Sequence, residues 1–521
     1  MADLPNLGQA LRRAVHIRGD GTAVIDGGKS FTWNGFAERV ARLAGVFAAN
    51  GLRAGGRVVL LSLNSHRSLE CFFAAIHAGG AIVPLNHRLA LRELCGQVAD
   101  CAPDVIVLGD DFLQHAADLA AAAGGTAALI HAGDGPAPAG LIAFEAALAD
   151  AAPLPDAGRC GDDLACLLYT SGTTSAAKGV MLSHGNFIAN TANTVAELEL
   201  DARSIHLHHG PLFHVAPAAR LFSLTHAAGT HVLLPRFIPG EVIAEMSRAG
   251  VTHATFVPTM FRAMLDDPAL ASADLSSLRI ISYGSSPMPE ALLDEMMAAL
   301  PEARFLQSYG MTELSPVVTI LGWRDHLPEA RDSGVLRSAG RPVMLADVAV
   351  VGPDDKPLPR GEAGEIVARG PNVMLGYWNR PDLTAEALRG GWMHTGDVGY
   401  FDDRGYLHVV DRLKDMIISG GENVYSQEVE NVLSAHPAVS QCAVFGRPHP
   451  HWGEAVHAVV TLKANVAATP EEIIAHCRDR IAHYKCPRTL DIRAEPMPLS
   501  GANKILKSAL RDELLAREAS S

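Results

Sequence analysis

The chain has 521 residues, of which 48% are hydrophobic and 19% are charged, and its formal net charge is −14. Because a single core rarely grows beyond about 250 residues, this length predicts about two to four domains. The acidic balance excludes a broadly basic surface, so we expect no nucleic-acid partner and a local site for any anionic ligand.

The cysteines and the N-terminus indicate the compartment. The eight cysteines form no CxxC pair and no regular framework, which predicts reduced thiols in a cytoplasmic protein. The N-terminal residues lack the basic-then-apolar order of a secretory signal, and no apolar run reaches the length of about 18 residues that a membrane helix needs. We therefore expect neither export nor an integral membrane segment.

The first part of the chain alternates between helical and strand patterns. Apolar residues recur every three to four positions over 33–50, which predicts an amphipathic helix. Apolar runs at 58–63 (VVLLSL) and 105–108 (VIVL) have strand length and are separated by helical stretches, which predicts a parallel sheet covered by helices. The Ala-rich residues 116–150 show little beyond helix and loop, and we expect a peripheral excursion there.

A second alternating stretch follows, with apolar runs at 231–235, 252–258 and 278–284 that predict a second α/β layer. After Gly340, short runs between Gly/Pro turns predict a small antiparallel unit.

The predicted fold class is therefore α/β. We expect a large N-terminal domain over 1–411, made of two α/β layers and a small β subdomain. The last residues, 412–521, have the size of a separate small α+β domain, which we expect to be mobile.

A loop with many small and hydroxyl residues gives the strongest chemical signal. In LLYTSGTTSAAKGV, an apolar strand leads into Ser171, Gly172, Thr173, Thr174 and Ser175 and then Lys178. Small residues let backbone N–H groups approach phosphate oxygens, hydroxyls add donors, and the ammonium adds a positive charge. The pattern favours a phosphate-binding loop, with a Ser/Thr-rich surface turn as the alternative.

The P-loop pattern fits this loop only in part. Ala177 stands where a P-loop has its second glycine, and Gly179 stands where it has the Ser/Thr that binds magnesium. A P-loop NTPase is therefore disfavoured.

Seven separated blocks together resemble the acyl-CoA synthetase branch of the adenylate-forming superfamily: TSGTTSAAKG, PLFH, YGSSPMP, QSYGMTE, GWMHTGD, DRLKDMIISGGENV and GANKILK. They occur in the family's order and span nearly the whole chain. The resemblance implies an AMP-forming carboxylate–CoA ligase that uses ATP, Mg²⁺ and CoA. A ligase that loads a carrier protein and a nucleotide-binding pseudoenzyme stay open as alternatives.

The resemblance also implies the nucleotide site. Tyr309 would stack on adenine, Asp397 would accept the ribose hydroxyls beside Arg412, and Glu313 with Thr173 would bind Mg²⁺. The implied ATP- and AMP-binding residues are Thr170, Ser171, Gly172, Thr173, Thr174, Lys178, Ser285, Ser286, Pro287, Gln307, Ser308, Tyr309, Gly310, Asp397 and Arg412. Taken singly, such residues are more often caps or turns.

The implied catalytic residues are Lys504, Glu313, Thr312 and His214. Lys504 would stabilise the charge that develops when the carboxylate meets the α-phosphate. An exposed tail lysine and a core histidine are the alternatives for Lys504 and His214.

The hinge between the two domains would lie at Lys414, and CoA would contact Ser419, Gly420, Gly421 and Glu422. Three residues depart from the family pattern: Ser175 and Ala177 in the phosphate loop, and Asn503 before the catalytic lysine. We expect altered pyrophosphate handling at most, because the lysines remain.

The acid-binding pocket is expected around 214–219, 283–286 and 310–320, which are mainly apolar or small. They suit a medium- or long-chain fatty acid or an aryl or phenylpropenoic acid. No arginine lies inside these stretches to pair a second carboxylate, so a dicarboxylate is less favoured; it stays open because Arg220 lies just beyond them. The sequence does not determine the oligomeric state, for which a homodimer is the hypothesis.

Overall fold

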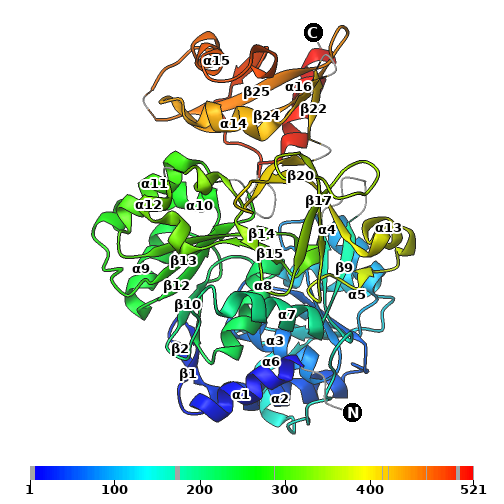
Figure 1. The fold of residues 1–521 in the computed structure, drawn as a ribbon. Coiled ribbons are helices and arrows are strands. Elements are labelled where there is room, and N and C mark those ends of the chain that lie inside the picture. Colours follow the sequence, from blue (N-terminus) through cyan, green and yellow to red (C-terminus); the bar gives the residue numbers. More distant parts are fainter. Residues whose placement is uncertain are drawn as a thin grey trace.

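The computed structural model describes residues 6–170, 177–286, 288–331, 333–412, 415–419, 422–464, 466–499 and 505–519. Within these residues the chain forms an α/β fold with four β-sheets, and a smaller C-terminal unit sits above the larger N-terminal part in Figure 1. The predicted fold class is confirmed.

The first sheet has the strand order β19-β9-β8-β4-β3-β5-β6-β7. Its strands are β3 Arg57–Leu61, β4 Ala81–Pro84, β5 Val105–Leu108, β6 Ala128–His131, β7 Ile142–Ala143, β8 Leu164–Thr170, β9 Lys178–Ser183 and β19 Gly376–Tyr377. The strands from β8 through β7 pair in parallel, as the alternating pattern predicts. Helices α2 Trp33–Ala49 and α3 His66–His77 pack on one face, and α4 Leu91–Cys101 and α5 Ala116–Ala122 pack on the other.

The prediction of a peripheral excursion over 116–150 is wrong. Strands β6 and β7 extend the first sheet in parallel at its edge, and α6 Phe144–Asp150 buries Phe144 in the main core. The strands were missed because each has only two to four residues and lies among alanines that fit a helix equally well.

The second sheet has the order β16-β15-β14-β13-β12-β10-β11-β1-β2. Its strands are β1 Thr22–Asp26, β2 Lys29–Thr32, β10 Ile205–His208, β11 Thr230–Leu233, β12 His253–Phe256, β13 Ile280–Gly284, β14 Arg304–Gly310, β15 Val317–Leu321 and β16 Arg341–Pro342. The three apolar runs predicted as a second layer are β11, β12 and β13.

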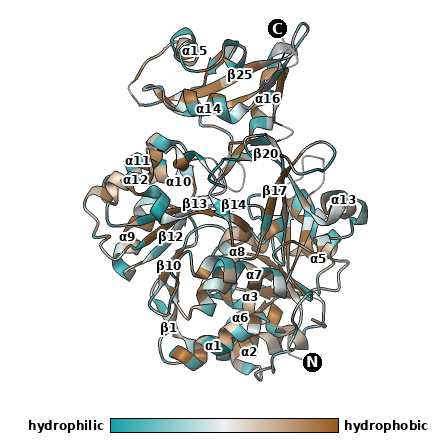
Figure 2. Cartoon of the chain, in the orientation of Figure 1, coloured by the Kyte–Doolittle hydropathy of each residue, from teal (hydrophilic) through white to brown (hydrophobic). Residues whose placement is uncertain are grey.

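Helices cover both faces of this second sheet. On one face lie α1 Leu7–Arg18, α7 His184–Val195 and α8 Val215–His226, which share a continuous core with α2, α3 and the first sheet. On the other face lie α9 Pro239–Ala249, α10 Pro258–Leu265 and α11 Glu290–Ala299. Figure 2 shows the hydrophobic colouring concentrated on strands inside these layers.

A small antiparallel sheet follows, as predicted after Gly340. Its strands are β17 Asp347–Val351, β18 Gly364–Arg369, β20 Met393–Phe401 and β21 Leu407–Arg412, and the short helices near it are α12 Pro328–Arg331 and α13 Pro381–Ala387.

The C-terminal unit is an α+β sandwich. Its strands are β22 Ile417–Ser419, β23 Glu422–Val424, β24 Val439–His449, β25 Gly453–Leu462 and β26 Thr489–Ile492, and its helices are α14 Ser426–Ser434, α15 Pro470–Arg478 and α16 Lys507–Ala519. Asp411 at the end of β21 accepts hydrogen bonds from the backbone N–H and the hydroxyl of Ser426, which joins α14 to the small sheet. The domain boundary at residue 412 stays a prediction.

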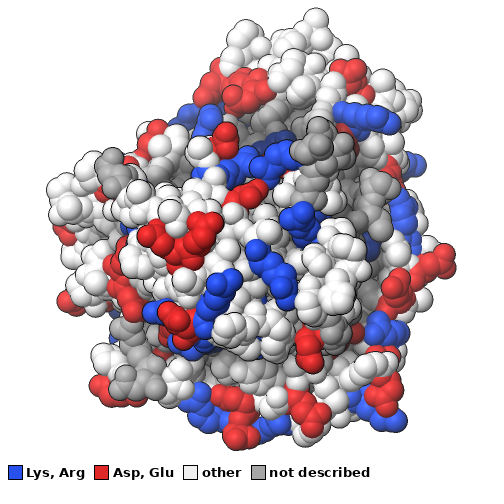
Figure 3. All heavy atoms as spheres, turned by 90° about the horizontal axis from the view of Figure 1, so that it is seen from above, with Lys and Arg blue, Asp and Glu red and all other residues white. Residues whose placement is uncertain are grey.

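The surface mixes charges of both signs. Figure 3 shows basic and acidic side chains sharing the face seen from above. Among the described residues, no helix combines the length and the apolar character needed to cross a bilayer.

Candidate active site

The ends of two parallel strands create an opening for a ligand. Strands β13 and β14 pair in parallel with Gly284 opposite Ser308, so their carboxyl ends meet at one edge of the second sheet. A side chain at Gly284 would collide with the backbone oxygen of Ser308, so only glycine permits this approach. Ligands of open α/β sheets bind outside the carboxyl ends of the strands, which makes this edge the candidate site.

The loop after β13 keeps its polar groups accessible. Ser285 is exposed and has a φ of 68°, a conformation that costs a non-glycine residue energy. Ser286 beside it is half-buried, and so are Gln307 and Ser308 at the end of β14. Pro287 lies outside the described residues.

Tyr309, Asp397 and Arg412 come together from three strands. The Tyr309 hydroxyl donates to Asp397 Oδ2 at 2.8 Å, and Arg412 Nε lies 3.2 Å from Asp397 Oδ1. Asp397 and Arg412 are register partners of β20 and β21, which aligns the two charges. Burial and the neighbouring Asp397 raise the pKa of Tyr309 well above its usual range, so the hydroxyl stays a donor.

Glu313 is buried with a tyrosine partner. It lies on a single 3-10 turn, Thr312–Leu314, and its Oε1 accepts a hydrogen bond from the Tyr377 hydroxyl at 2.9 Å. Burial raises the pKa of Glu313, whereas Tyr377, Arg412 and Lys178 act to lower it. Burial is the largest of these effects, so the net shift of the Glu313 pKa is upward. Thr312 beside it is half-buried.

Lys178 begins the strand that follows the phosphate-loop sequence. Thr170 at the end of β8 pairs with Lys178 at the start of the antiparallel strand β9. The Lys178 ammonium lies 5.0 Å from the centre of the Tyr377 ring, within range of a cation–π contact. Ser171, Gly172, Thr173 and Thr174 lie outside the described residues.

One segment ties this hairpin to Glu313. Backbone N–H groups of Trp378 and Leu375 donate to the carbonyl oxygens of Gly179 and Met181, and that of Met374 donates to the Glu313 carbonyl. Tyr377, on this segment, therefore touches both Lys178 and Glu313. Sequence reasoning missed Tyr377, since it lies outside every recognised motif block.

A side chain in Gly310's place would collide with the carbonyl of Pro316, so the turn after β14 also requires glycine.

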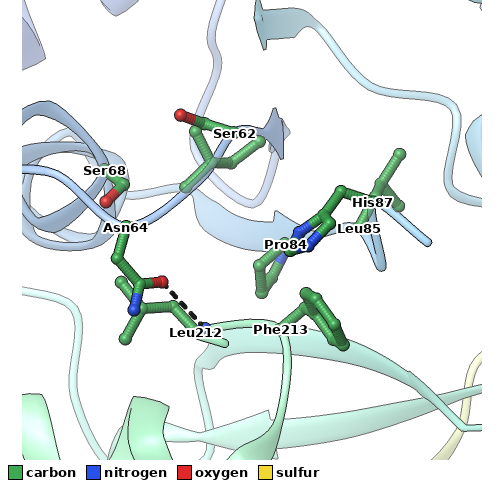
Figure 4. A pocket seen from close by; sticks show the side chains of 9 residues that line it. Ser62, Asn64, Ser68, Pro84, Leu85, His87, Leu212 and Phe213 are labelled. Atoms are coloured by element: carbon green, nitrogen blue, oxygen red, sulfur yellow. Dashed lines mark hydrogen bonds between the residues drawn. The ribbon is translucent and has the colours of Figure 1, made fainter. Parts of the chain in front are cut away.

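His214 stands at the start of α8, beside the first sheet. The Asn64 side chain accepts from the Leu212 backbone N–H at 3.3 Å and donates to the Gly210 carbonyl at 2.9 Å. Figure 4 shows Asn64 reaching Leu212 across a small cavity lined also by His87 and Phe213. The His214 ring packs against Phe213 with centroids 4.5 Å apart. These contacts fix the loop that presents His214.

The C-terminal predictions are described only in part. Ser419 is buried on β22, and Glu422 is exposed at the start of β23. The remaining predicted residues of this unit, Lys414, Gly420, Gly421 and Lys504, lie outside the described residues.

Residues 11–378 match the family model of the AMP-binding enzymes, and residues 428–504 match the model of the AMP-binding enzyme C-terminal domain. The chain therefore belongs to the AMP-binding enzyme family.

Similar proteins place it more finely. The chain is 42% identical over 504 residues to a feruloyl-CoA synthase of Amycolatopsis sp, covering 96% of this chain and 97% of the relative. It is 33% identical over 494 residues to a fatty acid–[acyl-carrier-protein] ligase of Streptomyces coeruleorubidus, covering 94% of this chain and 93% of the relative. A crystal structure of the anthranilate CoA ligase AuaEII with anthranoyl-AMP superposes with a TM-score of 0.92 at 26% identity, covering 100% and 99%. The resemblance to acyl-CoA synthetases is confirmed.

Proposed function

We propose that this chain is an AMP-forming ligase that joins an aryl carboxylic acid of the hydroxycinnamate type to CoA. The observation that carries the proposal is the cluster of Tyr309, Asp397 and Arg412 at the strand ends beside Gly284, with Glu313 on the turn that follows β14. The preference for an aryl acid is supported by the 42% identity to a feruloyl-CoA synthase and by the likeness to an anthranilate CoA ligase.

In the first half-reaction, a carboxylate oxygen of the acid attacks the α-phosphorus of ATP, and pyrophosphate leaves. Asp397 would accept the ribose hydroxyls, with its carboxylate oriented by Tyr309 and Arg412. Gln307, Ser308, Gly310, Ser285 and Ser286 would border the nucleotide and the acyl group. Lys178, next to Thr170 and the phosphate loop, would neutralise the leaving pyrophosphate, and Lys504 would neutralise the α-phosphate.

The residues present fit a magnesium ion carried by ATP. Glu313 offers a hard oxygen, and a carboxylate with phosphate oxygens and water is the ligand set that Mg²⁺ prefers. The ion would offset charge on the phosphates; Glu313 and Thr173 would hold it, and Thr312 would contact the phosphate beside it.

In the second half-reaction, the CoA sulfur attacks the acyl carbon, the bond to the AMP oxygen breaks, and a proton is released. Rotation of the unit over 412–521 about Lys414 would bring Ser419, Gly420, Gly421 and Glu422 to the CoA. His214 would border the path by which the thiol reaches the acyl carbon. The cytoplasmic location and a homodimer stay predictions.

Loading of a carrier protein is the second candidate. It is favoured by the 33% identity to a fatty acid–[acyl-carrier-protein] ligase over nearly the full length of both chains. The first half-reaction is the same in a CoA ligase and in a carrier-loading ligase. The two functions therefore differ only in the thiol that accepts the acyl group, that of CoA or that of a carrier protein.

The test is release of AMP and pyrophosphate from MgATP with ferulate, 4-coumarate, benzoate and fatty acids, each with and without CoA. CoA-dependent AMP release and a thioester product with the hydroxycinnamates are expected. Pyrophosphate exchange without thioester formation would favour carrier loading, and no turnover with any acid would favour a pseudoenzyme.

A further inference from the structure

Arg220 lies in the second turn of α8, and part of its surface is accessible. Its neighbours one turn earlier on the same helical face are Ala216 and Pro217, and all three keep part of their surface accessible. The residues on either side, Ala219 and Leu221, are buried in the main core. Arg220, Ala216 and Pro217 therefore form one partly accessible stripe on a helix whose other residues, apart from His226 at its end, are buried.

Arg220 is a charged group without an anionic partner in the described part of the chain. No described carboxylate forms an ion pair with it, and its Nε has no hydrogen-bond partner there. Arg220 Nη1 donates a long hydrogen bond of 3.5 Å to the Ser223 hydroxyl. Burial lowers the pKa of Arg220 to about 10, so the guanidinium remains charged at neutral pH. Removing a charge from water costs free energy unless an opposite charge or hydrogen bonds compensate for it.

Polar side chains continue from Arg220 across the sheet. Thr225 of α8 lies 3.1 Å from the His231 ring, which lies 3.0 Å from the His208 ring, so α8 covers the face of the sheet that carries these imidazoles. Burial, with a smaller effect of Arg220, lowers the pKa of His206, His208 and His253. These imidazoles are therefore neutral at neutral pH and supply no counter-charge to Arg220.

Polar side chains on the sheet connect these imidazoles to the candidate site. The Thr255 hydroxyl lies 3.4 Å from His206 Nε2 and 2.6 Å from the Ser282 hydroxyl. Ser282 is two residues before Gly284, so the two lie on the same face of β13 and roughly 7 Å apart. Thr255 is partly accessible although it lies on a central strand of the sheet. Partly accessible polar residues therefore lie on both sides of this row of imidazoles, at Arg220 and at Thr255.

We propose that Arg220 is the specificity-determining residue for the far end of the acid, where it donates hydrogen bonds to an oxygen substituent of the acyl group. This inference rests on the proposed function, because it places the activated carboxyl at Gly284 and the far end of the acid toward Thr255 and Arg220. Thr255 lies on the strand next to that of Ser282, and neighbouring strands are about 4.8 Å apart. The resulting distance from Gly284 to Thr255 suits an aromatic ring on a short chain better than a long alkyl group. A ring hydroxyl or methoxy oxygen supplies an acceptor for Arg220 Nε, which has no hydrogen-bond partner among the described residues.

The test compares wild type with Arg220→Met, which keeps the length of the side chain and removes the charge, and with Arg220→Lys. Arg203→Met, on the exposed surface, is the matched control. The rate constant kcat/KM for thioester formation is measured with ferulate, with cinnamate, which has no ring oxygen, and with 4-carboxycinnamate.

We expect the wild-type kcat/KM to be at least tenfold higher for ferulate than for cinnamate. Arg220→Met should abolish this preference by lowering kcat/KM for ferulate and leaving kcat/KM for cinnamate unchanged. If 4-carboxycinnamate is the best wild-type substrate and the most impaired in Arg220→Met, the acceptor is a second carboxylate; a ferulate optimum identifies a phenolic oxygen. Equal losses for ferulate and cinnamate would overturn the proposal, because they would indicate a purely structural role.

The variant also has a test that does not depend on turnover. Because Arg220→Met removes an unpaired buried charge, its Tm should equal or exceed that of wild type. If wild type forms no thioester with any acid, the proposed function fails. Binding of ferulate and cinnamate by calorimetry to wild type and Arg220→Met then still decides the inference, and equal affinities in both proteins would overturn it.

Discussion

Tyr309 and Asp397 are 88 residues apart in the sequence, and the Tyr309 hydroxyl donates a hydrogen bond of 2.8 Å to Asp397 Oδ2. This bond joins the second sheet to the small antiparallel sheet, since Tyr309 lies on β14 and Asp397 on β20. Two donors therefore orient the Asp397 carboxylate: the neutral Tyr309 hydroxyl and the positively charged Arg412 guanidinium. A carboxylate held in this way is ready to accept the hydroxyls of a sugar.

The first prediction concerns this bond. Tyr309→Phe keeps the ring for stacking and removes the donor, so the KM for ATP should rise about 5- to 10-fold, the effect of one hydrogen bond of about 1 kcal/mol. The measurement is the ATP dependence of pyrophosphate exchange. Tyr406→Phe is the matched control, because the Tyr406 hydroxyl donates to Asp325 at 2.7 Å in a bond of the same chemistry. Equal effects in both variants would contradict a special role of Tyr309.

The second prediction concerns Glu313. Glu313→Gln keeps the shape of the side chain and removes the charge that would bind magnesium, so adenylate formation should fall about 100-fold, with a higher Mg²⁺ requirement. Because burial raises the pKa of this carboxyl, the neutral amide should leave Tm unchanged or higher. Pyrophosphate exchange at varied Mg²⁺ checks the first effect, and calorimetry checks the second. Glu362→Gln, on an exposed loop, should change neither.

The arrangement at Glu313 could be predicted from the sequence only in part. The motif QSYGMTE indicates the glutamate through its resemblance, but nothing in that motif indicates Tyr377, whose partner lies 64 residues earlier. That contact depends on backbone hydrogen bonds between the segment around Trp378 and β9, which are tertiary and have no local signal. The same holds for Arg220, where the sequence shows a charge next to the pocket stretches but not the direction of its side chain.

The third prediction separates the two half-reactions. Lys504→Ala should lower adenylate formation at least 100-fold and leave CoA thioester formation from synthetic acyl-adenylate within about threefold of wild type, because its charge is needed only at the α-phosphate. Lys463→Ala, at an exposed position, is the control and should change neither rate. Equal loss in both half-reactions would contradict the role proposed for Lys504.

The strands that the sequence predicts well are those with strong apolar runs. Residues 105–108 form β5 as predicted, since four consecutive apolar residues between turns suit a strand buried on both faces. Strands β6 and β7 were not predicted, because each has only two to four residues among alanines that fit a helix equally well. They are placed by pairing, β6 with β5 and β7 with β6. Long-range pairing therefore decides the elements that local pattern leaves ambiguous.

The last prediction is a pH dependence of stability. Asp26 Oδ2 accepts hydrogen bonds from the His66 ring, at 2.6 Å, and from the His66 backbone N–H, at 2.9 Å. Burial alone would raise the pKa of Asp26 and lower that of His66, but these bonds outweigh it, so the pKa of Asp26 is lowered and that of His66 is raised. Glu145 and Glu70, which also face His66, contribute to the raised pKa of the imidazole.

The sign follows from these two shifts. The contribution of His66 is fully present below its unfolded pKa of about 6.5 and is lost as pH rises through its higher folded pKa. The contribution of Asp26 is present above its unfolded pKa of about 3.9 and is lost only as pH falls through its lower folded pKa. Both contributions are therefore present near pH 6, and that of His66 is absent at pH 9.

Asp26→Asn should consequently destabilise the protein by about 1–3 kcal/mol at pH 6 and by less at pH 9, where the imidazole is neutral. Urea unfolding at the two pH values measures the difference. Asp20→Asn is the control, because Asp20 is exposed and its carboxylate accepts a hydrogen bond from a neutral group, the side-chain amide of Asn34. A destabilisation by Asp26→Asn that is as large at pH 9 as at pH 6 would show that the bond does not depend on a charged His66.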